Sequence, residues 1–244
     1  MPLPPDRPPG WEKPKLTEHL EHLWANSIAT FANKREAHRL CRIDDLLFEA
    51  ASDWKGSPPN VETIVPLMMF FRAHSAFRAA AALGFGGATV EGLAVLRLCL
   101  EYAGYAALIA GDPSLAQAWF DRDTSAAGKA VVRKAFTHGA IKAAIEKADP
   151  KLSSAYGELY ERLIQFGAHP NEKSVTANLK IDEESKRTLL NQIYLQGDGI
   201  TLDHWLRTAN QIGISILKIF AIVHVARFTV LDLEPRIQEL SNGL

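Results

Sequence analysis

Hydrophobic positions along the chain recur mostly at intervals of three and four residues, which is the spacing of one face of an α-helix. The clearest run covers residues 88–110, which are apolar on nearly every side. A helix without a polar face normally lies inside its domain. We therefore expect residues 88–110 to form the central helix of the fold.

This run contains only three charged residues, Glu91, Arg97 and Glu101. Its length would suffice to cross a bilayer, but each charge would cost roughly 2.5 to 3.5 kcal/mol near the membrane centre, so a buried helix is favoured. Arg97 and Glu101 are four residues apart and lie on one helical stripe with Gly104. A buried charge must be paired or hydrogen-bonded. The two residues therefore form an internal ion pair or face a pocket, and Gly104 leaves room for another backbone or a ligand.

Several other stretches of the first half show the same periodicity. Residues 15–54 are predicted to be helical, either as one long helix or as two helices that meet in the polar segment 33–39. A second apolar helix runs to about Leu83, and its regular part is expected to begin or kink at Pro66. The glycine-rich segment 84–87 then ends it. A connection this short predicts an antiparallel hairpin with the central helix.

Two pairs of residues farther along the chain predict helix starts. Asp112–Pro113 and Asp149–Pro150 each combine an N-cap residue with proline at the first helical position. The first pair opens a short helix, and the second opens a helix that continues to about Gly167. Between them, weaker periodicity over residues 124–147 predicts one peripheral helix.

After Gly167 the hydrophobic period changes. Residues 175–181 alternate between apolar and polar side chains, which is a strand signal, and residues 189–195 form either the return strand or a short helix. The last long helix is expected over residues 202–231, capped by Thr201 or Asp203.

These elements together predict an all-α protein, a helical bundle around a central apolar hairpin, with a possible small β-hairpin near residues 174–196. Residues 1–14 contain six of the thirteen prolines, so we expect an extended or disordered proline-rich arm there, in which Trp11 alone could anchor the arm to a surface. Residues 15–244 form a single helical domain. A chain of 244 residues that is 47% hydrophobic can bury the core that such a domain needs.

Composition and charge narrow the function classes. The formal net charge is −1, and the absence of a basic excess disfavours a nucleic-acid or membrane-surface protein. Cys41 and Cys99 are separated by a long stretch and lie in helical patterns, so we interpret both as reduced thiols. The N-terminal segment lacks the apolar core of a signal peptide. We therefore expect a cytoplasmic protein that does not contact a membrane.

The common motifs of cofactor and metal chemistry do not occur. The chain contains no GxxxxGK[ST], no GxGxxG after a strand, no HExxH, no CxxC, no GxSxG and no ExxH pairs of the di-iron type. We accordingly predict no cofactor and no metal site.

Two groups of polar residues remain as candidates for a site. His74 and Arg78 are four residues apart on one helical face, and the predicted hairpin would allow them to approach Arg97 and Glu101. Arginines suit the binding of phosphate or carboxylate, so these four residues could line a pocket for a small anionic ligand.

The second group lies where the helix that follows Asp149 ends. His169 is at this helix end, where a loop side chain is both positioned and exposed, and its ordinary pKa near 6.5 suits acid–base work. Arg162 precedes it on the helix, and Asn171 follows it in the HisProAsn segment.

An apolar hairpin carrying an arginine and a glutamate, followed by a helix that ends in HisProAsn, resembles uncharacterised bacterial all-helical proteins and, more distantly, the HEPN superfamily. That family's motif is an arginine, a polar residue and then a histidine, with four to six residues in between. Arg162 and His169 have six residues between them, although Leu163 is not polar. Arg133 and His138 have four between them, beginning with a polar lysine.

The resemblance implies a helical bundle, commonly dimeric, and many HEPN domains are metal-independent ribonucleases. By this resemblance His169 would be the acid or base, and Arg162 would hold a phosphate at a dimer interface. Three functions stay open: a self-associating or protein-binding module, which we prefer, a HEPN-like RNA-cleaving or RNA-binding protein, and a protein that binds a small anion. A homo-oligomer is the expected assembly, and RNA or a small anion the possible ligand.

Overall fold

The computed structural model describes residues 7–52, 54, 60–168, 172–184 and 187–244. Over these residues the chain is 78% helical, with twelve α-helices and one small antiparallel sheet of two strands. The prediction of an all-α bundle with a small β-hairpin is therefore confirmed.

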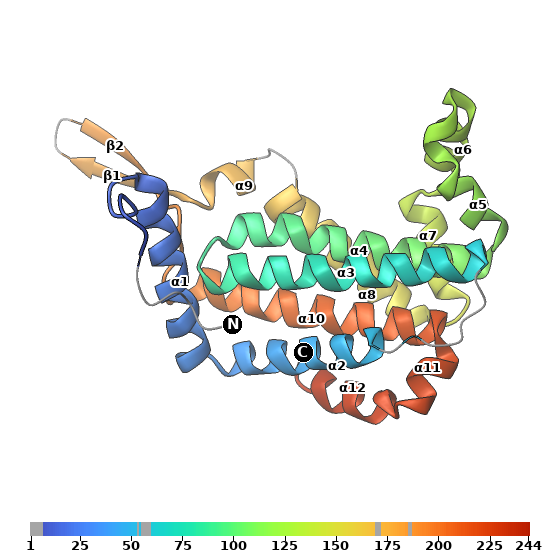
Figure 1. Cartoon of the computed structure of the whole chain (residues 1–244). Coiled ribbons are helices and arrows are strands. Elements are labelled where there is room, and N and C mark those ends of the chain that lie inside the picture. Colours follow the sequence, from blue (N-terminus) through green and yellow to red (C-terminus); the bar gives the residue numbers. More distant parts are fainter. Residues whose placement is uncertain (1–6, 53, 55–59, 169–171, 185–186) are drawn as a thin grey trace.

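Four helices run side by side and form the body of the bundle (Figure 1). They are α2 (Arg35–Ala51), α3 (Val61–Phe85), α4 (Thr89–Gly111) and α10 (Ile200–Val223). Helices α3 and α4 form the predicted antiparallel hairpin, α10 packs against α4, and α2 packs against α10.

Helix α4 has the most covered position. It contacts α3, α10, α7 and α8, and twelve of its residues are buried, among them Leu96, Cys99 and Leu100. Burying large aliphatic side chains contributes about 1.5 to 3 kcal/mol each, which is why an apolar helix takes this place. The prediction of a central helix at residues 88–110 is confirmed.

Helix α1 (Lys15–Asn33) ends where the chain becomes extended at Lys34, so the helical pattern of the first fifty residues belongs to two helices that meet there. Figure 1 shows α1 lying across one end of the bundle. The Asn26 amide donates to the carbonyl of Gly86 at 3.1 Å, and the Thr30 hydroxyl donates to that of Phe85 at 2.9 Å. The last carbonyls of a helix have no partner within it, so α1 supplies donors to the C-terminal end of α3.

Two boundaries in the first half differ from the prediction. Helix α3 begins at Val61, five residues before Pro66, because Asn60 caps it by accepting a hydrogen bond from the amide of Thr63. Helix α5 (Ser114–Phe120) begins one residue after Pro113.

The single helix predicted over residues 124–147 is wrong. The chain forms α6 (Ala126–Ala135) and then α7 (His138–Glu146), because the Thr137 hydroxyl accepts from the amide of Ala140 and starts a new helix. The short 3₁₀ turn η1 (Arg122–Thr124) precedes α6. Helix α6 projects from the bundle (Figure 1), as the peripheral interpretation required, whereas α7 packs on α4 and α8.

The predicted cap at Asp149 is confirmed. Its carboxylate accepts from the amides of Lys151 and Leu152, and α8 (Pro150–Leu163) begins with proline. A π-helical turn, η2 (Ile164–Ala168), continues α8.

The β-hairpin lies within the predicted residues 174–196, but its first strand begins later, and its second strand earlier, than the sequence pattern suggested. A short helix, α9 (Glu172–Thr176), occupies the start of the predicted strand, and β1 (Leu179–Glu184) pairs with β2 (Arg187–Gln192) in the register Leu179 opposite Gln192.

The C-terminal part contains more helices than predicted. Helix α10 follows Gly199 without a side-chain cap from Thr201 or Asp203, and it ends at Val223 instead of residue 231. Helices α11 (Val225–Val230) and α12 (Leu233–Ser241) follow, and α12 covers α2 and α10 with buried leucine and isoleucine side chains.

Helices α4 and α10 are long and apolar enough to span a membrane by length and composition. In the most apolar stretch of each, 56% and 67% of the residues are buried against other helices. The core helices of water-soluble proteins have the same length and composition, so this property by itself assigns no compartment.

Candidate functional site

The charged couple on α4 is half-buried and closed on itself. The Arg97 Nε donates to the Glu101 Oε1 at 2.7 Å, and its Nη2 donates to the hydroxyl of Tyr160 on α8 at 3.2 Å. The guanidinium carbon also lies 5.3 Å from the centre of the Tyr160 ring. Burial lowers the pKa of Arg97, but Glu101 and Tyr160 together raise it more, so the cation is stabilised where it lies.

Aromatic rings extend this cluster toward α7. The imidazole of His138 stacks on the Tyr160 ring at 4.3 Å and on the Tyr156 ring at 5.6 Å between centroids. The Nδ1 of His138 and the hydroxyl of Tyr156 are buried without a hydrogen-bond partner among the described residues. Burial lowers the pKa of His138 and raises that of Tyr156, since both charged forms would lose solvation.

The space above Gly104 is filled by side chains of the same chain. A Cβ atom at this position would lie 2.7 Å from the Ile141 Cγ2 and 2.8 Å from the Tyr156 hydroxyl. Gly104 therefore admits α7 and α8 to the surface of α4. The close approach predicted from the sequence is made by these side chains.

His74 and Arg78 belong to a second cluster, around Asp44 of α2. The His74 Nε2 lies 2.8 Å from the Asp44 Oδ1, and Arg78 donates to both carboxylate oxygens through Nε and Nη2 at 2.9 to 3.1 Å. Burial raises the pKa of Asp44, but the hydrogen bonds and charges of its two partners outweigh burial and lower it overall. This cluster joins α2 to α3.

The structure therefore gives the four residues of the predicted anion pocket different partners. Arg97 and Glu101 pair with each other and reach α8, whereas His74 and Arg78 pair with Asp44. Each arginine already holds a carboxylate at charged hydrogen-bond distance.

Arg162 is held against α10. Its Nη1 donates to the Gln211 Oε1 at 2.6 Å and lies 3.4 Å from the Thr208 hydroxyl. Arg162 also lines an open cavity of about 620 Å³ together with His138 and Lys142. The cavity brings together the arginine of one HEPN-like match and the histidine of the other.

His169 and Asn171 lie outside the described residues, so their predicted roles stay predictions. Sequence reasoning missed Asp44 and Tyr160 as partners of the predicted arginines. Neither lies at a helical spacing from its partner, and only the packing of separate helices brings them together.

The outer side of α1 carries a row of large apolar side chains that the other described residues leave largely exposed, although the last of them, Phe31, lies 4.3 Å from the ring of His38 on α2. These residues are 44% to 67% exposed, and we call them the α1 face: Leu16, Leu20, Trp24, Ile28 and Phe31. Single exposed apolar side chains are common, whereas a row of five on one helix is a feature typical of interaction surfaces.

No group of three or more His, Cys, Asp or Glu side chains with metal-binding geometry occurs among the described residues. Cys41 and Cys99 are both free thiols, as predicted. Burial raises the pKa of the Cys99 thiol well above its ordinary value, so this side chain behaves as a small hydrophobic group of the core.

No family model, no curated protein and no solved structure matches this chain.

Proposed function

We propose that this protein is a self-associating helical module, and that the α1 face packs against the same face of a second copy. The observation that carries the proposal is the row of five large apolar side chains left open on a helix whose opposite side is attached to the bundle. Helices bury such rows against other helices because water contact with the apolar surface is unfavourable.

The pattern of the row supports a second copy as the occupant. Trp24 lies at its centre, Leu20 and Ile28 lie four residues to either side, and Leu16 and Phe31 lie eight and seven residues away. A two-fold axis through Trp24 would pair each half of the row with the other half in antiparallel helices. Two-fold interfaces require this self-complementarity, because the same patch meets itself.

The charges beside the row fit the same arrangement. Glu18 and Glu21 lie in the first half of α1, where each also pairs with a nearby cation of the same chain, and Arg35 and Arg39 follow its C-terminal end. Antiparallel pairing places the acidic half of one helix near the basic end of the other, and it opposes the two helix dipoles favourably.

A neighbouring element enlarges the surface. Tyr194, just after β2, is 70% exposed, and its ring lies 6.3 Å from the ring of His19 on α1. Stable interfaces bury about 800 Å² on each partner, more than one helical row provides. We therefore place the segment around Tyr194 at the edge of the same interface. We also propose that the protein is cytoplasmic, as the sequence led us to expect.

The first experiment is light scattering coupled to size-exclusion chromatography, over protein concentrations from about 1 to 100 μM. The parent is expected to be a dimer, and Trp24→Glu is expected to be a monomer with unchanged helical circular dichroism. Val230→Glu is the matched control, since Val230 is 81% exposed on α11, and it should remain dimeric. A parent that stays monomeric at the highest concentration contradicts the proposal.

A cysteine scan tests the antiparallel geometry. Trp24→Cys places two thiols at the two-fold axis and should form a disulfide-linked dimer under mild oxidation, whereas Leu16→Cys should not. A parallel pair would cross-link both variants. The parent, which keeps Cys41 and Cys99, shows the background.

A second function, metal-independent RNA cleavage or RNA binding of the HEPN-like type, is supported by one specific observation. His138, whose pKa burial lowers, shares a cavity with the cationic side chains of Arg162 and Lys142. A histidine that is neutral at physiological pH can accept a proton, and the two cations can hold a phosphate.

An assay of RNA cleavage in EDTA tests this alternative. His138→Ala, His169→Ala and Arg162→Ala are compared with the parent, and folding of each is checked by thermal melting. Loss of cleavage in the arginine variant and in one histidine variant supports this function and identifies the histidine. Cleavage that is unchanged in all three variants, or absent in the parent, contradicts it, provided that binding of labelled RNA is absent too.

A further inference from the structure

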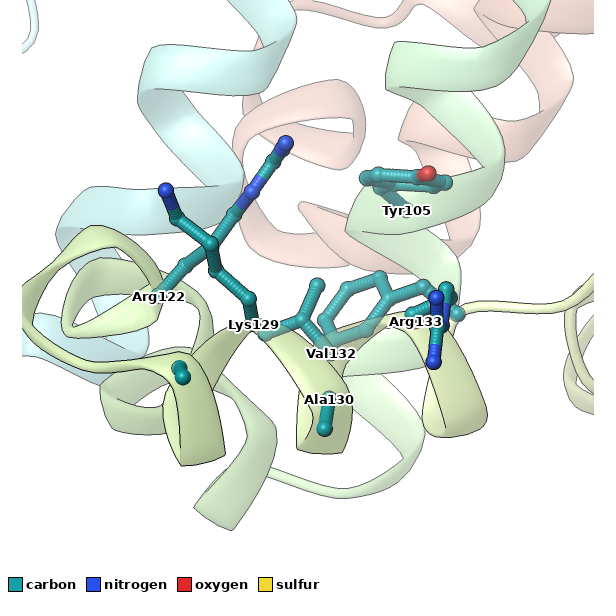
Figure 2. A pocket seen from close by; sticks show the side chains of 8 residues that line it. Tyr105, Arg122, Lys129, Ala130, Val132 and Arg133 are labelled. Atoms are coloured by element: carbon teal, nitrogen blue, oxygen red, sulfur yellow. The ribbon is translucent and has the colours of Figure 1, made fainter.

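A cavity of about 410 Å³ lies where α6 and η1 project beyond the end of α4. Figure 2 shows its side chains: Arg122 from η1, Lys129 and Arg133 from α6, and Tyr105 from α4. Its volume is within the range of small-molecule sites. It shares no lining residue with the α1 face or with the Arg97 cluster.

The cations of this cavity lack close anionic partners. The Arg122 Nε and the Lys129 Nζ lie 3.8 and 3.5 Å from the same carboxylate oxygen of Asp123, longer than the roughly 2.7 to 2.9 Å of a charged hydrogen bond. Arg133 forms no ion pair with any other described residue. Arg78 and Arg97, in contrast, each hold a carboxylate at 2.7 to 2.9 Å.

Asp123 does not neutralise this group. Its side chain is 75% exposed, so water screens its charge, and its single carboxylate faces both Arg122 and Lys129. Because Arg122 and Lys129 both lie within 3.8 Å of the same oxygen of Asp123, they are close enough together for one anionic group to contact both. A phosphate can accept bidentate hydrogen bonds from a guanidinium and a further contact from an ammonium group.

Aromatic side chains form the inner wall. The rings of Tyr105 and Phe136 contact each other at 4.8 Å between centroids, and Phe136 is buried whereas Tyr105 is half-buried. Burial, together with the charge of Glu101, raises the pKa of Tyr105, so its hydroxyl remains protonated and available as a donor. The wall offers a flat apolar surface beside the cations.

We propose that this cavity binds a small phosphorylated molecule that carries a planar ring. Its phosphate lies at Arg122 and Lys129, and its ring lies against Tyr105. This site is independent of the proposed dimer.

Isothermal titration calorimetry of the full chain tests the proposal with four probes: AMP, pyrophosphate, adenosine and citrate. AMP is expected to bind at least tenfold more tightly than adenosine, which lacks phosphate, and than citrate, which carries carboxylates only. Pyrophosphate is expected to bind more weakly than AMP because it has no ring. Absence of AMP binding at millimolar concentration overturns the proposal, and so does equal binding of citrate.

Variants locate the binding site. The double variant Arg122→Gln with Lys129→Gln should lower AMP affinity at least tenfold, and Tyr105→Leu should lower it severalfold while leaving pyrophosphate affinity unchanged. Lys134→Gln is the matched control, because Lys134 is exposed on the same helix and does not line the cavity. It should keep AMP affinity within twofold. Equal losses in the double variant and the control overturn the proposal, since they indicate nonspecific attraction.

Discussion

Helices α4 and α1 both carry long rows of apolar side chains, but only those of α4 are covered by the same chain. Helix α4 is enclosed by α3, α10, α7 and α8, whereas the α1 face is open. The two helices differ in whether other helices of the same chain pack over their apolar side chains. Apolar periodicity indicates which face of a helix favours burial. It does not indicate whether the covering residues belong to the same molecule.

The two helices are also attached in different ways. Helix α4 is held mainly by close packing of buried side chains. Helix α1 is attached partly by the hydrogen bonds of Asn26 and Thr30 to the end of α3, with Leu23 packed on Gly86. Polar attachment of this kind sets the position of a helix without covering its outer side.

The largest effect is expected from truncating matched leucines in the two helices. Leu100 of α4 is fully buried, so Leu100→Ala removes packed methyl groups and leaves a cavity, which should lower the free energy of unfolding by about 2 to 5 kcal/mol. Leu20→Ala in α1 should change the stability of the monomer by less than about 0.5 kcal/mol. Urea denaturation at low protein concentration measures both. Similar losses at the two positions would remove the distinction between the helices.

The covered region should also make stability depend on pH. His224, at the end of α10, is surrounded by the rings of Trp54, Phe70 and Phe220, and burial lowers its pKa to about 4. The unfolded chain binds a proton at this site near pH 6.5 and the folded chain only near pH 4, so stability is complete above 6.5 and falls between these values.

The corresponding loss is about 3 kcal/mol at 1.36 kcal/mol for each pKa unit. His224→Gln should flatten this part of the profile of unfolding free energy against pH. His22→Gln, at an exposed position on α1, should leave the profile of the parent unchanged. If His224→Gln keeps the full loss of stability at acid pH, other groups cause that loss.

A smaller effect is expected from the ion pair on α4. Arg97→Met leaves the half-buried carboxylate of Glu101 without its partner, which should cost about 1 to 3 kcal/mol. Adding Glu101→Leu should restore most of the lost stability, because the half-buried site can accommodate a pair of apolar side chains. On α1 the exposed pair Lys15 and Glu18 should show no measurable coupling. A double-mutant cycle at each pair measures the difference, and equal coupling energies would contradict it.

Local signals in the sequence predicted much of the fold. The hairpin of α3 and α4, the cap at Asp149 and the ion pair of Arg97 with Glu101 all depend on residues close together in sequence. The helix break at Thr137 and the separate helix α12 were missed, because the amphipathic pattern near each could also continue a neighbouring helix.

The candidate site was less predictable for a physical reason. Asp44 reaches His74 across thirty residues, and Tyr160 reaches Arg97 across sixty-three. Such contacts depend on how whole helices pack, and a periodic pattern carries no information about the rotation of one helix relative to another. The roles of His169 and Asn171 stay predictions.

The turn at residues 84–87 receives contacts from three directions. The carbonyl of Gly86 accepts from α1, that of Gly87 accepts from the amide of Gln196 at 2.8 Å, and Gly84 lies against the ring of Trp205. Gly87 also has a φ of +93°, which favours glycine. Although it is a connection between helices, this turn is a poor place for an inserted epitope or a circular-permutation cut. Gly197 suits that purpose better, since a Cβ there would meet no atom within 4 Å.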